Sequence, residues 1–372
     1  MRRNKVIAIL LSALVGGGLV ATATSVGIFP AKSEESFATQ SVSFYGKHQN
    51  GVELERQANS TLVALDISAD TDLAAMGRYM RVLTSDSSLL VKGRAIIGDA
   101  QPEMAENPAR LTINFSFGYS LFEKLGITER WPIAEVAIPK YKIDSLEKRW
   151  DDGDLLIQVS GDNPQSVFHA VHTLVKESAP FATIRWQQRG FLDPAGVNEG
   201  KDSRNLMGQI DGTANAALFS KEYAERTWSN SGGLKDGTVV VVRRIRLNLG
   251  TWDRLSHNAK SESLGRSLSG GQKLESETAF GKSHVGRAFT ENNSGITRRG
   301  YNYDDGYLES GTHDVGLIFI SYQESLERYL RIQSALNEQD ELNRWTTPVG
   351  SALFISPKGV SKDGWIGSEF FK

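Results

Sequence analysis

The feature that most constrains this chain is an ordered series of β-rich and helical segments that occurs twice. Its predicted strands are rich in β-branched residues, whereas its predicted helices repeat apolar residues every three or four positions. The first half is predicted to run strand, helix, strand, strand, helix, strand, at residues 60–67, 71–85, 110–117, 155–160, 163–176 and 182–186. The fifth of these begins at Asn163-Pro164, which is typical of a helix start because proline suits the first helical position.

The second half follows the same plan, although the two halves share no residue-level repeat. Its predicted elements are strands and one helix, at residues 238–247, 315–322, 326–342 (the helix) and 352–355. The order strand, helix, strand, strand, helix, strand is typical of ferredoxin-like units. We therefore predict an α+β fold of two ferredoxin-like domains, residues 34–203 and 204–372. The Gly- and Ser-rich segment 261–277 is predicted to be a loop.

The N-terminus has the composition of an export signal. Arg2 and Arg3 precede an apolar run from Val6 to about Val20, and small residues follow. This order of charged, apolar and small residues predicts an export signal over residues 1–33. The adjacent arginines favour the twin-arginine route, with general secretion and a retained membrane anchor as alternatives. The protein is thus predicted to be exported to the cell envelope, periplasm or extracellular space.

Composition narrows the chemistry that the chain can carry out. It contains no cysteine, which excludes disulfides, thiolate nucleophiles and thiolate metal ligands. The formal net charge is −2, and no cluster of basic residues interleaved with aromatic residues stands out. Nucleic-acid binding is therefore not predicted.

Two kinds of polar residue are candidates for a functional site. Asp211 lies in Gly208-Gln209-Ile210-Asp211-Gly212, which on its own would be read as a turn, because Asp-Gly is a common turn dipeptide. The chain also has six histidines. His169 and His172 would share one face of a helix, but no third ligand follows at matching spacing, so a packed or solvated helix face is the preferred interpretation. His48 is interpreted as structural, and His257 and His313 as loop residues.

The segment from Arg204 to Asn215, which contains Asp211, resembles the GxxDG signature region of the dye-decolorizing (DyP-type) haem peroxidases. Other segments resemble the same family in the same order, at residues 44–49, 111–121, 154–175, 185–191, 243–252, 298–301 and 349–354. The resemblance extends from about residue 42 to the C-terminus. It is closest to the exported, EfeB-like deferrochelatase/peroxidase branch, which is associated with iron uptake. It implies a fold of the dimeric α+β barrel type, with haem held mainly by the C-terminal domain.

The resemblance also implies a cofactor and three principal residues. The cofactor is one non-covalently bound haem b per chain. His284 would be the proximal ligand of the haem iron, Asp211 the distal acid–base residue, and Arg298 the distal charge stabiliser, with Arg299 as its rival. General acid–base assistance of this kind typically contributes ~10²–10⁴-fold to a rate.

Further residues would support the haem. Arg204 and Asn205 would bind a propionate, since the arginine fork suits a carboxylate; the alternative is a salt bridge within a loop. Gly208, Gly212 and Thr213 would lie against the porphyrin, where glycine permits close approach of the backbone. Asp340 would accept a hydrogen bond from His284 and raise its basicity, with Glu341 as the alternative residue. For Asp340 and Glu341 alike, the alternative is a charged side chain on the solvent-exposed face of a helix.

The implied activity is reduction of hydrogen peroxide through a ferryl intermediate, with oxidation of aromatic or dye donors. One alternative is a deferrochelatase that releases iron from haem in an iron-uptake system. Another is a haem-binding module without turnover, although such a module would need His284 but neither Asp211 nor Arg298. The implied partners are hydrogen peroxide, an aromatic or dye donor or haem itself, components of an iron-uptake system, and further copies of the chain in a homo-oligomer.

Overall fold

The computed structural model describes residues 37–194, 203–275, 281–289 and 295–372, which belong to one compact unit. The predicted export signal lies outside the described residues. Within those ranges, no helix is both long and apolar enough to cross a bilayer.

The first half contains the six elements that its sequence predicts. They are β1 (Asn59–Ile67), α1 (Leu73–Leu90), β2 (Thr112–Phe117), β3 (Leu155–Gly161), α3 (Pro164–Ser178) and β4 (Ala182–Phe191), with α2 (Tyr119–Lys124) after β2. Four single-turn 3₁₀ helices are η1 (Phe37–Thr39), η2 (Pro102–Met104), η3 (Thr128–Arg130) and η4 (Lys148–Trp150). α3 begins where the Asn-Pro pair predicts, because the Asn163 side chain accepts a hydrogen bond from the Gln165 amide.

The second half has more elements than the sequence predicts. They are α5 (Lys221–Thr227), η5 (Gly232–Leu234), β5 (Thr238–Leu247), α6 (Leu249–Trp252), α7 (His257–Leu264), α9 (His284–Ala288), β6 (Thr297–Arg298), β7 (Tyr301–Tyr307), β8 (His313–Gln323), α10 (Leu326–Gln339), η6 (Glu341–Arg344), β9 (Thr346–Ser356) and α11 (Ser368–Phe371). The prediction of a loop over residues 261–277 is wrong for its first residues, because α7 extends to Leu264. That helix is capped by the Ser256 side chain and terminated by Gly265, whose φ is 84°.

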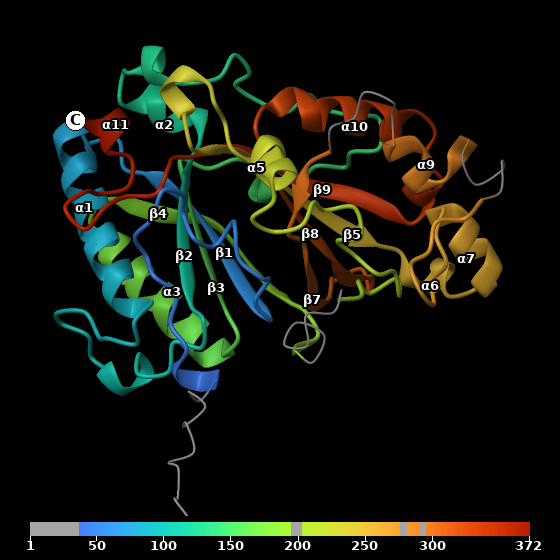
Figure 1. Ribbon diagram of the computed structural model, residues 1–372, viewed down its shortest axis with the longest axis horizontal. Coiled ribbons are helices and arrows are strands. Elements are labelled where there is room, and N and C mark those ends of the chain that lie inside the picture. The colour runs from blue at the N-terminus through green and yellow to red at the C-terminus, as the bar shows by residue number, and fades with distance from the viewer. Residues whose placement is uncertain (1–36, 195–202, 276–280, 290–294) are drawn as a thin grey trace, which may run out of the picture. The chain divides into compact units, whose positions relative to one another are not determined.

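The strands form one antiparallel sheet that closes on itself (Figure 1). Eight strands follow the order β5-β9-β2-β3-β1-β4-β7-β8, and β8 pairs with β5 again to complete the ring, while β6 adds to β8. The two halves meet at narrow seams. In the described strands the register is Phe117 opposite Ile355 at one seam and Phe191 opposite Asn302 at the other. The coarse prediction of mixed α and β structure is confirmed.

Alternation along β5 shows how the ring is packed. Val240 and Val242 contribute to an apolar cluster enclosed by the strands, whereas Val239 and Val241 belong to the cluster beneath the helices. Successive side chains of a strand point to opposite faces, so each strand serves both clusters. The ring therefore leaves one face of every strand available to an outer layer of helices, in which α1 and α3 pack against the first half.

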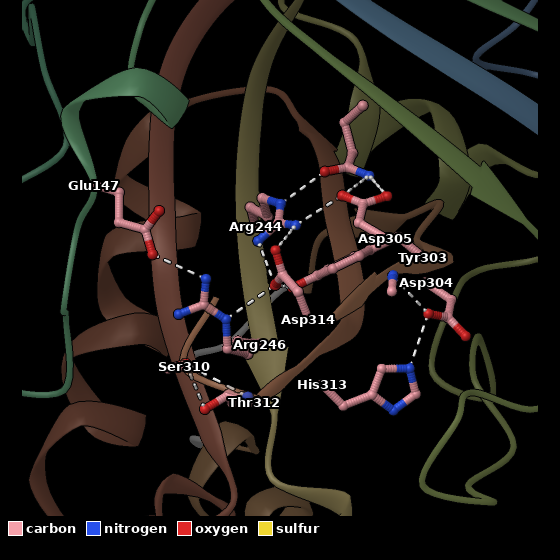
Figure 2. A network of polar contacts seen from close by, with 12 residues as sticks. Glu147, Arg244, Arg246, Tyr303, Asp304, Asp305, Ser310, Thr312, His313 and Asp314 are labelled. Carbon is pink, nitrogen blue, oxygen red and sulfur yellow. Dashed lines mark hydrogen bonds and ion pairs between the residues drawn. The ribbon is translucent and has the colours of Figure 1, made fainter. Parts of the chain in front are cut away.

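A network of charges around the buried pair of Arg244 and Asp314 joins several strands (Figure 2). Arg244 of β5 donates to Gln188 of β4, to Asp305 of β7 and to Asp314 of β8. Arg246 donates to the same Asp314, at 2.9 Å, and to Glu147. The network thus connects residues on both sides of the seam between β4 and β7.

Candidate active site

A cavity of about 290 Å³ is lined by outward-facing residues of β5 and β8 and by residues of α9 and α10. Ligand pockets commonly measure roughly 300–1,000 Å³. Most of its wall is apolar and comes from residues after 204, among them Met207, Ile245, Leu247, Val285, Leu317, Phe319, Ile332 and Leu336. Ile143 contributes from the first half. A flat, apolar cofactor with a few charged groups suits such a wall.

His284 and Asp340 form a hydrogen-bonded pair in the cavity wall. His284 is the first residue of α9, which is capped by the Ser283 side chain, and its Nδ1 lies 2.7 Å from Asp340 Oδ2. Asp340 Oδ1 accepts from the Leu342 amide at 2.9 Å, so both carboxylate oxygens are engaged. The Asp340 side chain is 3% exposed and that of His284 is 28% exposed. Because Nδ1 is committed to the carboxylate, Nε2 is the ring nitrogen left for a metal ion.

Glu341, the alternative partner for His284, forms an ion pair with Arg344 at 3.1 Å instead. Neither Glu341 nor Arg344 is among the cavity-lining residues, whereas Asp340 is. The structure therefore brings together His284 and Asp340, and leaves Glu341 on the other side of the turn.

Asp211 and Arg298 also line the cavity and lie close to each other. Arg298 NH2 is 3.6 Å from Asp211 Oδ1, which accepts a hydrogen bond from the Gly212 amide at 2.8 Å. Arg298 is positioned by Asn215, whose side chain bonds both its backbone amide and its carbonyl. Arg299 does not line the cavity; it is buried and donates to the Leu54 carbonyl. Of the two adjacent arginines, only Arg298 thus reaches the cavity.

Of the predicted haem-contact residues around Asp211, some line the cavity and others do not. Asn205 and Thr213 line the cavity. Arg204 does not; its guanidinium donates to the carbonyls of Gly208, Leu268 and Ser269 and so ties two loops together. Asn205 caps the same turn by accepting from the Met207 and Gln209 amides.

Gly208 and Gly212 also lie outside the cavity wall. Their φ angles are 83° and 95°, in the region that favours glycine. The turn geometry around Asp211 therefore accounts for both glycines without a contact to a cofactor.

Three further arginines line the cavity and were not singled out from the sequence. Arg243 is buried against Asp144 and Tyr329, and Arg226 pairs with Glu222. Arg266 donates to the Gly271 carbonyl at 2.9 Å, and no carboxylate of the described residues forms an ion pair with it. Burial and the positive charge of Arg298 lower the pKa of Arg266 below its ordinary value. The sequence offered one indication of these residues, because Arg243 stands in a strand that is otherwise rich in β-branched residues.

The other five histidines stay outside the cavity. His169 Nε2 lies 2.9 Å from Asp99 Oδ2, and His172 stacks on Phe168. Among the described residues, no group of three His, Cys, Asp or Glu side chains could hold a metal ion. Both His169 and His172 lie on α3, where one is packed and the other more exposed, as the helix-face interpretation predicts.

The fold and site thus define a class of protein: a closed ring of strands with a histidine–aspartate pair and an aspartate–arginine pair in the wall of one largely apolar cavity. Family models identify it further. Residues 49–192 match the model described as Dyp-type peroxidase, N-terminal, and residues 202–361 match the model described as Dyp-type peroxidase, C-terminal. The chain belongs to the Dyp-type peroxidase family.

Individual relatives agree with that assignment. The dye-decolorizing peroxidase of Thermobifida fusca is 35% identical over 67% of this chain and 65% of its own length. A deferrochelatase of Escherichia coli is 29% identical over 97% of this chain and 94% of its own. The crystal structure of a DyP-type peroxidase from Cellulomonas bogoriensis is 35% identical, with a TM-score of 0.85 over 91% of this chain and 100% of that one. Ferric DtpA from Streptomyces lividans, 28% identical, also superposes with a TM-score of 0.85, over 90% of this chain and 98% of that one.

Proposed function

We propose that this chain is a haem b peroxidase that reduces hydrogen peroxide and oxidises aromatic or dye donors. The observation that carries the proposal is the meeting of two polar pairs, His284–Asp340 and Asp211–Arg298, in one apolar cavity. A protein that only binds haem would need the first pair but has no use for the second.

The cavity residues fit one non-covalently bound haem. His284 offers Nε2 to the iron, because its Nδ1 is bound by Asp340. The apolar wall suits the macrocycle. Arg266, which pairs with no carboxylate in the described part of the chain, supplies a cation for a propionate. We assign the propionate to Arg266 in preference to Arg204, which is engaged by three carbonyls. The absence of cysteine excludes thioether attachment.

In the proposed mechanism, bound haem supplies an iron that takes up the oxidising equivalents of the peroxide. Asp211 accepts a proton from one oxygen of hydrogen peroxide and delivers it to the other, which leaves as water. Arg298, with its fixed charge, stabilises the negative charge that develops on the departing oxygen. His284 holds the cofactor, and Asp340 fixes the orientation of its imidazole.

The test is the absorption spectrum before and after one equivalent of hydrogen peroxide in wild type and Asp211→Asn. We expect the variant to retain its Soret band but to react with peroxide at least ~100-fold more slowly, because it loses an acid–base group. Asp253→Asn is the control, since Asp253 is an exposed aspartate of the same half. A wild-type rate in Asp211→Asn would remove Asp211 from the mechanism.

A deferrochelatase role is the second candidate, because the Escherichia coli relative that matches 97% of this chain bears that name. In this role haem is the substrate, and iron leaves while the porphyrin stays intact. Cells that express the chain should then accumulate free protoporphyrin without added peroxide. A peroxide-dependent spectrum without protoporphyrin would favour the peroxidase.

For the architecture, we propose two ferredoxin-like domains, with the boundary between residues 203 and 204. The strand orders β2-β3-β1-β4 and β7-β8-β5-β9 support this, because each half follows the same order relative to its own sequence. In the second half, α6, α7 and α9 lie in the first crossover, between β5 and β7, and α10 forms the second. Haem would thus be held mainly by the C-terminal domain, in which most of the cavity wall lies.

We also propose export by the twin-arginine route and assembly into a homo-oligomer that works with iron-uptake partners. The composition of residues 1–33 supports export. Cell fractionation of wild type and an Arg2→Lys, Arg3→Lys variant tests the route, and light scattering tests the oligomer. Equal export of the wild type and the double-lysine variant would favour general secretion.

A further inference from the structure

A second arginine, Arg56, reaches Asp211 from the first half of the chain. Its NH1 lies 3.6 Å from Asp211 Oδ2, whereas Arg298 NH2 lies 3.6 Å from Oδ1. The side chains of Arg56 and Asp211 are 13% and 17% exposed, so this pair is largely shielded from solvent. Each oxygen of the carboxylate therefore has its own guanidinium group.

Arg56 also holds the backbone on which the distal residues lie. Its NH1 donates to the Gly300 carbonyl at 3.3 Å and its NH2 to the Asp211 carbonyl at 3.5 Å. Gly300 follows Arg298 by two residues, so one side chain connects the Asp211 turn with the strand that carries Arg298. Arg56 is anchored in turn, because Arg110 donates to its carbonyl at 3.4 Å and pairs with Asp162 at 2.6 Å.

Arg56 itself is not among the residues that line the cavity. Its side-chain contacts are to Asp211 and to the Gly300 carbonyl, so its influence on the reaction would pass through Asp211. A carboxylate flanked by two cations is held between them, whereas one flanked by Arg298 alone would turn toward that arginine. A closer pair with Arg298 would occupy the oxygen needed for proton transfer and would misplace it, and small misplacements of reacting groups cost up to ~100-fold.

We propose that Arg56 is a positioning residue for the distal site: it fixes the Asp211 carboxylate from behind the cavity and keeps it available for proton transfer. This inference rests on the proposed role of Asp211. It also makes the first half of the chain a contributor to the reaction, although the cavity wall comes almost entirely from the second half.

The experiment compares haem-loaded wild type, Arg56→Gln, Arg56→Lys, Asp211→Asn and the Arg56→Gln, Asp211→Asn double variant. Stopped-flow absorption gives the rate constant with hydrogen peroxide. The time course of the Soret shift after mixing with cyanide gives the rate constant of cyanide binding, a readout separate from turnover. Cyanide binds as an anion after losing a proton, so its binding also needs a positioned distal base. Arg185→Gln is the matched control, because Arg185 likewise pairs with a carboxylate, Asp66, and donates to a backbone carbonyl.

We expect Arg56→Gln to slow both reactions ~10- to ~100-fold while haem content and the apparent KM for the dye stay at wild-type values. Arg56→Lys should react at a rate between those of wild type and Arg56→Gln, since it keeps the charge but cannot make both carbonyl bonds of the guanidinium. In the Asp211→Asn background, Arg56→Gln should have no further effect. A wild-type rate in Arg56→Gln, an equal loss in Arg185→Gln, or the same fold-loss in the Asp211→Asn background would overturn the inference.

The same set separates this inference from the proposed function. If Asp211→Asn reacts at the wild-type rate, the role of Asp211 fails and the role of Arg56 with it. If Asp211→Asn is slow and Arg56→Gln is not, only the positioning role fails. Should Arg56→Gln not fold, Arg56→Lys decides, because the lysine cannot make both carbonyl bonds of the guanidinium: a cyanide-binding rate at the wild-type value would overturn the role, and a slower rate with full haem content would support it.

Discussion

At the residue scale, Asp340 shows what sequence reasoning could and could not decide. The sequence placed a carboxylate behind His284 at Asp340 or Glu341, and these neighbours are indistinguishable by spacing. Their surroundings differ at the end of α10, where Asp340 caps the Leu342 amide and meets His284, whereas Glu341 turns to Arg344. The direction of a side chain at a helix end depends on the turn that follows, and no residue pattern encodes it.

Replacing Asp340 by Asn should therefore change the cofactor while the neighbouring replacement does not. The amide still accepts a hydrogen bond from His284 but lacks the charge that makes the imidazole more basic, so the ferric state loses stabilisation. We expect a more positive ferric/ferrous midpoint potential by spectroelectrochemistry and a ~10- to ~100-fold slower reaction with peroxide. Glu341→Gln is the control, and equal potentials in the two variants would contradict the assignment.

At the scale of elements, regular segments were predicted well and those shaped by distant partners were not. The strand at 238–247 has the predicted bounds, because its β-branched run is buried on both faces. β7 was not predicted, since it contains Asp304-Asp305-Gly306, which is typical of a turn. Asp305 is instead stabilised within the strand by Arg244, a residue some sixty positions earlier in the chain. A tertiary ion pair here outweighs local propensity.

The contact between α7 and α9 offers a test of how elements position His284. Gly265 ends α7 with φ of 84°, and a Cβ at this position would lie 2.5 Å from Ser283 Oγ, the cap of α9. Gly265→Ala should cost about 1–2 kcal/mol from the left-handed backbone alone and should push Ser283 and His284 from their places. We expect a lower Tm and roughly 10-fold weaker haem affinity, measured by thermal unfolding and haem titration.

Gly281→Ala is the control for this change, because a Cβ there would meet nothing within 4 Å. Gly281 lies three residues before His284, and its replacement by alanine adds the same methyl group. Full haem affinity in Gly265→Ala would show that α7 does not position α9.

At the scale of the whole molecule, closure of the ring could not be predicted from the periodicity of the residues, although the family resemblance implied a barrel. Each seam between the halves has little strand pairing, so the halves are joined mainly by long-range contacts: an enclosed apolar cluster, and the bonds of Arg244 to Gln188 and of Arg246 to Glu147. These residues are far apart in the sequence, and the local sequence gave no indication of these pairings. The order of elements was predictable because it depends on local periodicity, whereas ring closure depends on contacts between the halves.

The network of Arg244, Arg246 and Asp314 predicts how stability should depend on pH (Figure 2). Burial alone would raise the pKa of Asp314, but hydrogen bonds from Arg244 and Arg246 outweigh it and hold that pKa below its ordinary value. A carboxyl group with a lower pKa in the folded state stabilises the fold above its unfolded pKa, ~3.9, and this stabilisation is lost as the pH falls through the folded pKa. Part of the acid unfolding of this protein should therefore come from Asp314.

Asp314→Asn should lower the free energy of unfolding by about 3 kcal/mol at pH 7, because it leaves the buried Arg244 and the partly buried Arg246 guanidinium groups short of a partner. Its Tm should also fall less steeply than that of wild type below about pH 4, since the group that titrates is gone. Asp304→Asn is the control: Asp304 lies in the adjacent strand but is 47% exposed and pairs only with His313, so the expected loss is below about 1 kcal/mol. Urea unfolding of both variants between pH 3 and pH 7 measures these differences. Parallel pH profiles for Asp314→Asn and wild type would show that the acid sensitivity arises outside the network of Arg244, Arg246 and Asp314.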